Sequence, residues 1–301
     1  MTGGLRGGGW LPALTLGLLA ACNADTPGRD APAVAGSAPR IVTLSPHLAE
    51  LVDAVGARDL LVGVSAYTSF GSDVTLPPEI GDAFVVDLES LSLIEPDLVL
   101  AWASGTPQRT IEELRDRGYR VESVVTENLA DVASALVRIG DLTGHSATAE
   151  RASSRYLQRL ASLRQQQSGK PPIRVFYQIS AKPLYTINGA HFLSELIELC
   201  GGRNVFSDLA ELAPLVSEEA VLARDPETVL TATADPAGAA ADAFAGWRRW
   251  STLAANRYDN YFVIDSALVA RPTPRLVDGG QAMCQALDES RRHRRLADRK
   301  K

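Results

Sequence analysis

The chain has 301 residues, of which 46% are hydrophobic and 22% are charged, so it can bury the core of one or two domains. This composition excludes a disordered chain, because disordered chains combine low hydrophobicity with high charge. The formal net charge of −6 argues against a surface that follows nucleic-acid phosphates. We therefore expect a globular protein that has no nucleic-acid partner.

The N-terminal residues have the pattern of an export signal. Arg6 precedes an uncharged, mostly apolar run over residues 10–21, which is short for a membrane-spanning helix. The run ends in Leu19-Ala20-Ala21-Cys22, which resembles the lipobox of bacterial lipoproteins. We predict a signal peptide over residues 1–21, lipidation of Cys22 and a flexible tether over residues 22–39, with a plain secretory signal as the alternative.

The body of the chain contains an internal repeat. Residues 50–59 resemble residues 195–204, and each copy has a helical pattern that ends at a glycine. Residues 89–100 resemble residues 219–230, and each copy has an acid-Pro-acid turn before an apolar run. Two matches in the same order predict two related lobes.

Strand and helix patterns alternate within each predicted lobe. In the first, the β-rich runs and helical patterns cover residues 40–44, 48–55, 61–64, 98–101, 106–117, 120–125 and 129–142. In the second, the β-rich runs cover residues 174–179, 228–231 and 261–264. Such alternation is typical of an α/β fold in which helices cover both faces of a mostly parallel sheet.

One long helical pattern separates the two lobes, with small and apolar residues at steps of three and four. We predict two Rossmann-like lobes with mostly parallel central sheets, joined by this helix, with a ligand cleft between the lobes. The predicted boundaries are an N-terminal lobe over residues 40–145, a connecting helix over 146–169, a C-terminal lobe over 170–290 and a basic, disordered tail over 291–301.

The three cysteines agree with export. If Cys22 carries lipid, Cys200 and Cys284 remain as a candidate disulfide, which an oxidising compartment permits. Two free buried thiols are the alternative.

Several motifs resemble those of one family. They are Pro39-Arg40-Ile41-Val42-Thr43-Leu44-Ser45-Pro46, Ala101-Trp102, Leu199-Cys200-Gly201-Gly202, Val216-Ser217 and Thr273-Pro274-Arg275. Between residues 38 and 287 the chain resembles the solute-binding proteins of ABC importers that carry metal chelates, most closely the periplasmic vitamin B12-binding protein family. The resemblance implies a monomer that captures cobalamin or a related corrinoid and delivers it to a permease and, through the permease, to its ATPase. It also implies a periplasmic location with a lipid anchor as the only membrane attachment, no cofactor besides the transported ligand and no enzymatic activity.

Aromatic residues follow several of the predicted strands. Tyr67, Trp102 and Tyr185 lie near the carboxyl ends of strands, where ligands bind in open α/β sheets. Flat rings suit a flat macrocycle, and core packing is the alternative for each ring. The resemblance adds Phe70 and a loop to the ligand-binding set, and the loop residues are Ala267, Leu268, Val269, Ala270 and Arg271.

Two acids occupy equivalent positions in the repeat. Glu89 and Glu219 each lie at the start of a short predicted helix. The family resemblance implies that such acids dock onto arginines of the permease, because carboxylate–guanidinium pairs give register and orientation. Stabilisation of their own helix dipoles is the alternative role.

Two other classes of function remain to be considered. A haem or ferric-siderophore binder of the same class is the main alternative, with His47 or His191 as a ligand of the bound metal. Four histidines, of which two are placed near a cleft, are too few for a bare-metal receptor, so we predict no metal site. The motifs of phosphate-binding loops, dinucleotide folds, zinc proteases and serine hydrolases are absent from the sequence, so we expect no enzyme.

Overall fold

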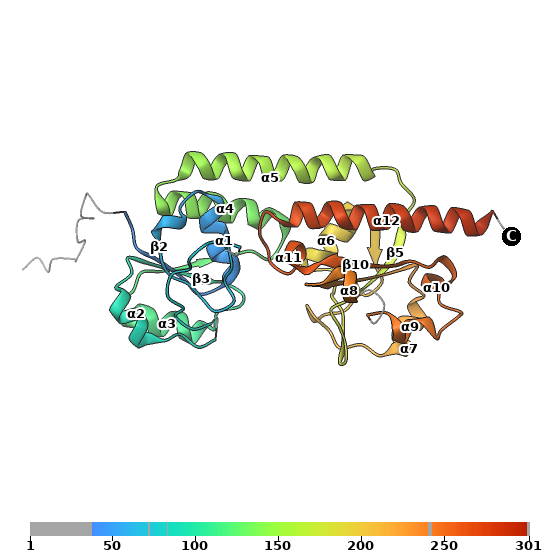
Figure 1. Cartoon of the computed structure of the whole chain (residues 1–301), viewed down its shortest axis with the longest axis horizontal. Coiled ribbons are helices and arrows are strands. Elements are labelled where there is room, and N and C mark those ends of the chain that lie inside the picture. Colours follow the sequence, from blue (N-terminus) through green and yellow to red (C-terminus); the bar gives the residue numbers. More distant parts are fainter. Residues whose placement is uncertain (1–37, 72, 83, 240–242, 300–301) are drawn as a thin grey trace, which may run out of the picture. The chain divides into compact units, whose positions relative to one another are not determined.

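The computed structural model describes residues 38–299 except residues 72, 83 and 240–242 (Figure 1). The predicted signal peptide, Cys22 and nearly all of the predicted tether lie outside the described residues. Among the helices that the structure does describe, none combines the length and the apolar character needed to cross a membrane.

The first lobe is built on a four-stranded parallel sheet in the order β2-β1-β3-β4. Its elements in chain order are β1 (Ile41–Thr43), α1 (Pro46–Ala54), a 3-10 turn (Arg58–Leu60), β2 (Leu61–Gly63), α2 (Leu88–Ile94), β3 (Leu98–Trp102), α3 (Gln108–Asp116), β4 (Val121–Val124) and α4 (Leu129–Thr143). The helix α5 (Ser146–Gln167) follows and packs against α4.

The second lobe has its own parallel sheet, in the order β10-β9-β5-β8. Its elements are β5 (Ile173–Gln178), β6 (Ser180–Ala181), β7 (Leu184–Tyr185), α6 (Phe192–Leu199), β8 (Gly202–Asn204), α7 (Glu218–Arg224), β9 (Thr228–Thr233), α8 (Pro236–Ala239), α9 (Ala245–Arg248), α10 (Ala254–Tyr258), β10 (Tyr261–Asp265), α11 (Ser266–Val269) and α12 (Leu276–Asp298). The long helix α12 contacts both α5 and α6.

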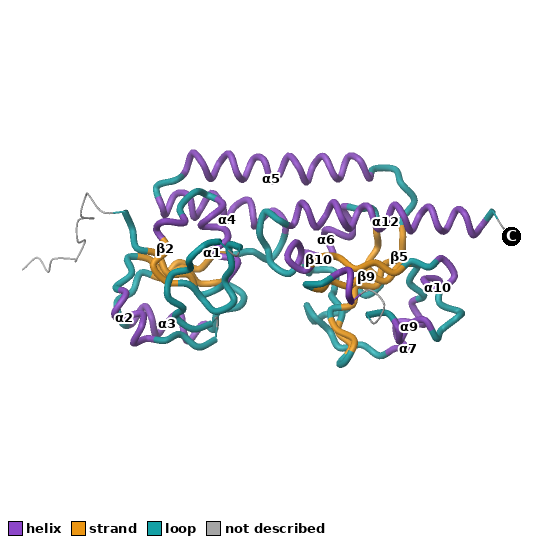
Figure 2. Tube along the Cα trace, viewed as in Figure 1, coloured by secondary structure: helices purple, strands orange, loops and turns teal. Residues whose placement is uncertain are grey.

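The two sheets share one topology. When the four strands of each sheet are counted in chain order, the first strand has the second on one side. The third and then the fourth lie on the other side of the first strand. Figure 2 shows each group of strands lying between layers of helices. The predicted α/β class with parallel sheets is therefore confirmed.

Alternation along the strands explains why both sheet faces are covered. Leu98 and Leu100 of β3 belong to the core beneath α1 and α4, whereas Val99 and Ala101 belong to the core beneath α2 and α3. Successive side chains of a strand point to opposite faces, so an apolar run without polar positions buries both. This is the pattern that the sequence shows.

The repeated acid-Pro-acid turns have the same backbone form and accept the same kind of hydrogen bond in both lobes. Glu95 and Asp225, which end α2 and α7, both have positive φ angles, of 47° and 42°. The last acid of each turn accepts a hydrogen bond from the backbone N–H at the first strand of its lobe, at 2.7 Å from Arg40 to Asp97 and 3.0 Å from Arg174 to Glu227. Each turn therefore ties the end of a helix to the start of an interior strand of its sheet.

The cysteine pair forms the predicted bond. Cys200 and Cys284 are joined by a disulfide with a Cα–Cα distance of 4.7 Å. The bond connects the end of α6 to the middle of α12. The alternative of two free thiols is therefore wrong.

The predicted disordered tail over residues 291–301 is wrong for most of its length. The helix α12 continues to Asp298, and Arg291 is only 2% exposed. The Arg291 guanidinium donates to the carbonyl oxygens of Pro171 and Cys200, both at 2.8 Å. A buried guanidinium is stable when its donors are satisfied, and here the loop after α5 and the end of α6 supply the acceptors.

Candidate ligand-binding site

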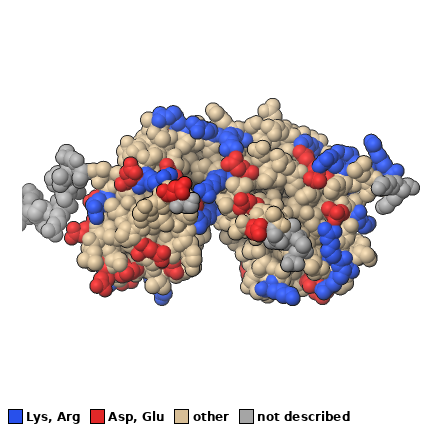
Figure 3. Space-filling model, viewed as in Figure 1, with Lys and Arg blue, Asp and Glu red and all other residues tan. Residues whose placement is uncertain are grey.

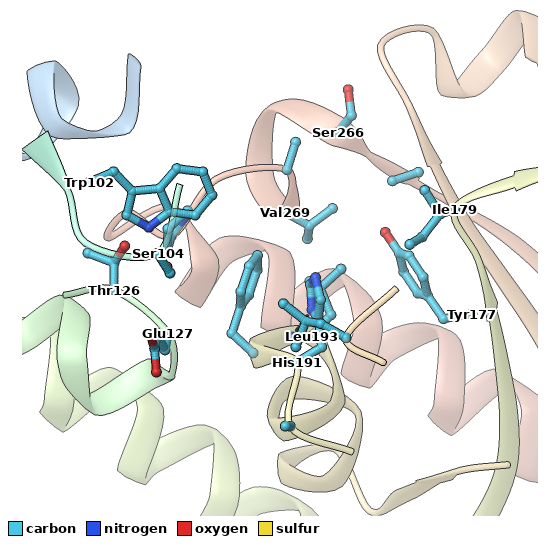
Figure 4. A pocket seen from close by; sticks show the side chains of 16 residues that line it. Trp102, Ser104, Thr126, Glu127, Tyr177, Ile179, His191, Leu193, Ser266 and Val269 are labelled. Atoms are coloured by element: carbon cyan, nitrogen blue, oxygen red, sulfur yellow. Dashed lines mark hydrogen bonds between the residues drawn. The ribbon is translucent and has the colours of Figure 1, made fainter. Parts of the chain in front are cut away.

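A cavity of about 620 Å³ lies between the two sheets, and both lobes contribute to it (Figure 4). The loops after β3 and β4 line one side of it, and the carboxyl end of β5, the start of α6 and the segment around α11 line the other. The lining residues are Trp102, Ser104, Thr126, Glu127, Tyr177, Ile179, Ala190, His191, Phe192, Leu193, Leu212, Ala232, Ser266, Val269, Ala270 and Pro272. Parallel sheets bind ligands at this end of their strands.

Trp102 is the largest side chain that the first lobe contributes to the cavity. Its backbone N–H donates to the Thr106 hydroxyl at 3.1 Å, and the Thr106 N–H donates back to the Trp102 carbonyl at 2.9 Å. A Cβ at Gly105 would lie 1.8 Å from the indole, so only glycine allows the loop to pass over the ring. These contacts hold the ring in place before any ligand arrives.

His47 supports Trp102 from behind the cavity. Its ring meets the indole edge to face, with centroids 5.1 Å apart. Its Nδ1 lies 2.7 Å from the Ser45 hydroxyl and its Nε2 lies 3.3 Å from the Thr126 hydroxyl. Burial, helped by the charge of Arg271, lowers the pKa of His47 to about 4. A neutral ring with both nitrogens occupied has no lone pair to offer a bound metal.

His191 comes from the second lobe and does line the cavity. Figure 4 shows its ring at the floor, with Trp102 on one side and Tyr177 on the other. Its Nδ1 accepts a hydrogen bond from the Leu193 N–H at 3.1 Å and so caps α6. Burial lowers the pKa of His191 to about 4.

A second cavity, of about 380 Å³, adjoins the first and shares Ser266 and Ala270 with it. Arg271 lies here, and its guanidinium donates to Glu50 of α1 at 2.6 Å and to the Tyr67 carbonyl at 2.7 Å. Glu50 is only 7% exposed. Arg271 therefore links the second lobe to two segments of the first through a partly buried ion pair.

The predicted ligand-binding residues fall into three groups. Trp102, Val269 and Ala270 line the larger cavity, whereas Phe70, Ala267 and Arg271 line only the smaller one. Leu268 packs against the core of its lobe. Tyr67 and Tyr185 line neither cavity, and their exposed fractions are 83% and 37%.

The cavity is also lined by residues outside the set predicted from the sequence. Tyr177 is the next-to-last residue of β5, and Phe192 is the first residue of α6. The end of an apolar strand was a usable signal for Tyr177, because the residues at strand ends face the crevice. Thr126 and Glu127 follow β4 in the same way and carried the same signal.

The cavity has an unusual charge balance. Among the described residues that line it, Glu127 is the only Asp, Glu, Lys or Arg, and most of the others are apolar or carry a hydroxyl. Among the described residues, no group of three or more His, Cys, Asp or Glu side chains could hold a metal ion. The cavity therefore suits a ligand that is uncharged where it contacts the protein, held by ring contacts and hydrogen bonds.

The two repeat-related acids occupy equivalent positions outside the cavity. Glu89 is the second residue of α2, Glu219 is the second residue of α7, and both are exposed. Figure 3 shows acidic side chains gathered over the end of the first lobe that carries α2 and α3. The Glu219 carboxylate accepts hydrogen bonds from its own backbone N–H and from the Ser217 hydroxyl. These bonds hold the pKa of Glu219 below its usual range.

The chain is similar to curated vitamin B12-binding proteins. The one from Vibrio cholerae serotype O1 is 32% identical over 251 residues, which cover 83% of this chain and 89% of that protein. The one from Vibrio parahaemolyticus is 28% identical over 256 residues, which cover 85% and 91%.

Solved structures agree. The crystal structure of the periplasmic vitamin B12-binding protein of Vibrio cholerae has a TM-score of 0.76 at 32% identity, over 84% of this chain and 98% of that one. The periplasmic heme-binding protein of Vibrio cholerae has a TM-score of 0.73 at 21% identity, over 83% and 99%, and shows the shared fold alone. The periplasmic binding protein family matches residues 41–268, so the family predicted from the sequence is confirmed and the chain belongs to it.

Proposed function

We propose that this protein captures cobalamin or a related corrinoid and delivers it to the permease of an ABC importer. The observation that carries the proposal is the cavity between the sheets, which is ring-lined and has one acid, Glu127, and neither Lys nor Arg among its described lining residues. Its curated relatives at 32% identity are vitamin B12-binding proteins. No bond of the ligand is made or broken, so the protein acts by binding and release and not as an enzyme.

The charge balance of the cavity favours a corrinoid over the alternatives. A corrinoid carries uncharged amide side chains, whereas haem carries two carboxylates. Carboxylates in an apolar cavity need cationic partners, and the larger cavity has neither Lys nor Arg among its lining residues. His47, one of the two predicted metal ligands, has both ring nitrogens in hydrogen bonds to protein hydroxyls.

A titration tests the proposed ligand. We expect the purified chain to bind cyanocobalamin, which would quench tryptophan fluorescence and shift the visible absorption of the corrinoid. Haemin and a ferric siderophore serve as competitors. Binding of haemin or the siderophore without binding of cyanocobalamin would refute the proposal.

Glu89 and Glu219 would dock the protein onto the permease. Both acids are exposed, and each is the second residue of its helix, α2 in one lobe and α7 in the other. A permease that contacts both lobes could therefore bind one acid on each. We expect the double variant Glu89→Lys, Glu219→Lys to abolish uptake while the affinity for cyanocobalamin stays unchanged. The matched control reverses two exposed helical acids elsewhere, Glu150 of α5 and Glu198 of α6, and should leave uptake intact.

The same uptake assay can contradict the docking role. If the Glu89 and Glu219 double variant shows full uptake, the docking role is wrong. The acids would then only stabilise the dipoles of their own helices. A fall in cyanocobalamin affinity would instead assign them to ligand binding.

The proposed location is the periplasm, where the chain would be a monomer with the acyl chains on Cys22 as its only membrane attachment. The lipobox-like segment before Cys22 supports the anchor. We expect Cys22→Ser to move the protein from the membrane fraction to the soluble periplasmic fraction. An unmodified mass for the mature N-terminus of the native protein would contradict lipidation.

A further inference from the structure

We infer that the cavity presents one donor-only hydrogen-bonding group, the Nε2–H of His191, and that His191 selects the ligand through this donor and not by binding its metal. The inference rests on the proposed function in one respect, that the cavity is where the ligand lies. It goes further by assigning the proton of His191 and its role.

The proton position of His191 follows from its place at the start of α6. Its Nδ1 lies 3.1 Å from the Leu193 backbone nitrogen, which can only donate. Nδ1 must therefore carry a lone pair, and in a neutral imidazole the proton is then on Nε2. The residue acts as an N-cap, a place that Ser, Thr, Asp or Asn usually occupies.

The charge state agrees with this assignment. Burial keeps the pKa of His191 near 4, so the ring is neutral at neutral pH. A protonated ring would present an N–H to the Leu193 N–H and lose the cap. The backbone therefore determines the tautomer, and the donor Nε2–H is left for the cavity.

Nothing in the described part of the chain accepts a hydrogen bond from Nε2 of His191. The ring instead lies beside the ring of Phe192, with centroids 4.5 Å apart. A bound ligand is then the natural partner, since a donor enclosed by a ligand would otherwise lose its hydrogen bond to water.

Trp102 lies on the other side of the cavity and comes from the other lobe. Its Nε1 is buried and has no acceptor within the described residues. Figure 4 shows the indole across the cavity from His191. Because the indole nitrogen is closed off from the cavity, Trp102 offers the ligand its ring, and the donor at Nε2 of His191 is the one that requires an acceptor on the ligand. The amide carbonyls around a corrin ring are acceptors of this kind.

This arrangement argues against metal binding by His191. To bind a metal through Nε2, the ring would have to move its proton to Nδ1, where the Leu193 N–H already points. The tautomer that caps α6 and the tautomer that binds a metal exclude each other. The second histidine considered as a ligand of haem iron is therefore held in the wrong form.

Two substitutions separate the cap from the donor. In His191→Asn the side-chain oxygen replaces Nδ1 and keeps the cap, but the donor at Nε2 is lost. In His191→Gln the side-chain amide reaches the place of Nε2 and keeps a donor, but the cap is lost. We expect His191→Asn to bind cyanocobalamin about tenfold more weakly at an unchanged melting temperature, and His191→Gln to bind more tightly than His191→Asn at a lower melting temperature.

The outcomes distinguish this inference from the proposed function. If the wild type binds cyanocobalamin and His191→Asn binds it equally well, the donor role is wrong and the proposed function stands. If the wild type binds haemin with a Soret shift that both variants lose, His191 binds the iron and both proposals fail.

A measurement on the free protein tests the tautomer whatever the ligand is. Long-range proton–nitrogen NMR spectra separate a protonated ring nitrogen from an unprotonated one. We expect the signals that disappear in His191→Asn to show Nε2 protonated at pH 7. A protonated Nδ1 would overturn the inference even if the proposed ligand binds.

Discussion

The disulfide between Cys200 and Cys284 should contribute several kcal/mol to the stability of this protein. The perturbation is the double variant Cys200→Ala, Cys284→Ala. The bond joins α6 to α12, both of which pack on the second sheet. Its loss therefore removes a cross-link between two helices that are far apart in sequence.

The expected size follows from the length of the loop that the bond closes. The two cysteines are 84 positions apart. The chain-entropy relation then gives about 4.6 kcal/mol at 25 °C, because the cross-link restricts the unfolded chain, and measured values are usually somewhat smaller. Both cysteines are buried, so the alanines also leave small voids that add to the loss. We expect the free energy of unfolding to fall by about 3–5 kcal/mol.

Urea unfolding followed by tryptophan fluorescence measures this change. Trp247 is buried in the second lobe and reports on its unfolding. With a slope of about 3 kcal/mol per M of urea, the midpoint should fall by about 1–1.7 M. Wild type unfolded in urea with a reductant is the matched control, because it loses the bond but keeps both sulfur atoms in place.

One result would refute this reasoning. If the double variant and the reduced wild type both lose less than about 1 kcal/mol, restriction of the unfolded chain is not what the bond supplies. If the free energy of unfolding falls strongly in the double variant but not in the reduced wild type, the voids left by the alanines cause the loss.

Three further predictions concern stability. His47 and His191 have pKa values of about 4 in the fold against 6.5 in the unfolded chain, so the unfolded chain binds more protons between these values. The free energy of unfolding should therefore fall by about 2 kcal/mol for each histidine as the pH drops from 7 to 5, as measured by urea unfolding at both values. Arg271→Met should lower it by about 2–3 kcal/mol, because Glu50 then keeps only one arginine, and the loss should shrink in the double variant with Glu50→Gln. Gly140→Ala should lower the melting temperature and cost about 2–3 kcal/mol, because its Cβ would lie 2.2 Å from a Cβ of α5.

Matched controls accompany these variants. Asn at both histidine positions should flatten the loss between pH 7 and 5, and an unchanged slope would contradict the assignment. Arg117→Met breaks an exposed ion pair and should cost less than about 0.5 kcal/mol. Gly246→Ala has open space around its new Cβ and should be near neutral, so equal losses at Gly140 and Gly246 would contradict the packing argument.

Local patterns in the sequence were sufficient to predict the fold class. The apolar run over residues 98–101, with no polar position, indicated a buried strand, and it lies within β3 of a parallel sheet. The two acid-Pro-acid turns indicated a repeat, and both turns have the same backbone form and the same acceptor role. Such features depend on residues within a few positions of one another, so a single sequence contains them.

The composition of the site depended on contacts that no local pattern shows. Trp102 was predicted and lines the larger cavity, whereas Tyr67 and Tyr185 line neither cavity. Tyr67 follows a strand, but its backbone has a φ of 64° and its ring is exposed. The position of a side chain after a strand therefore indicated the neighbourhood of the cleft but not the direction of the ring.

The sequence alone determined the two α/β lobes, the helix between them, the cysteine pair and the family, because periodicity, turn residues and motifs act over short stretches of chain. Only the tertiary structure decided which groups are buried together. Arg271 pairs with Glu50 across 221 positions, and Arg291 reaches a carbonyl 91 positions away. In the sequence, a charged residue of an exposed tail looks the same as a buried one that donates to backbone carbonyls. The free energy of burying a charge depends on acceptors that only the folded chain brings near.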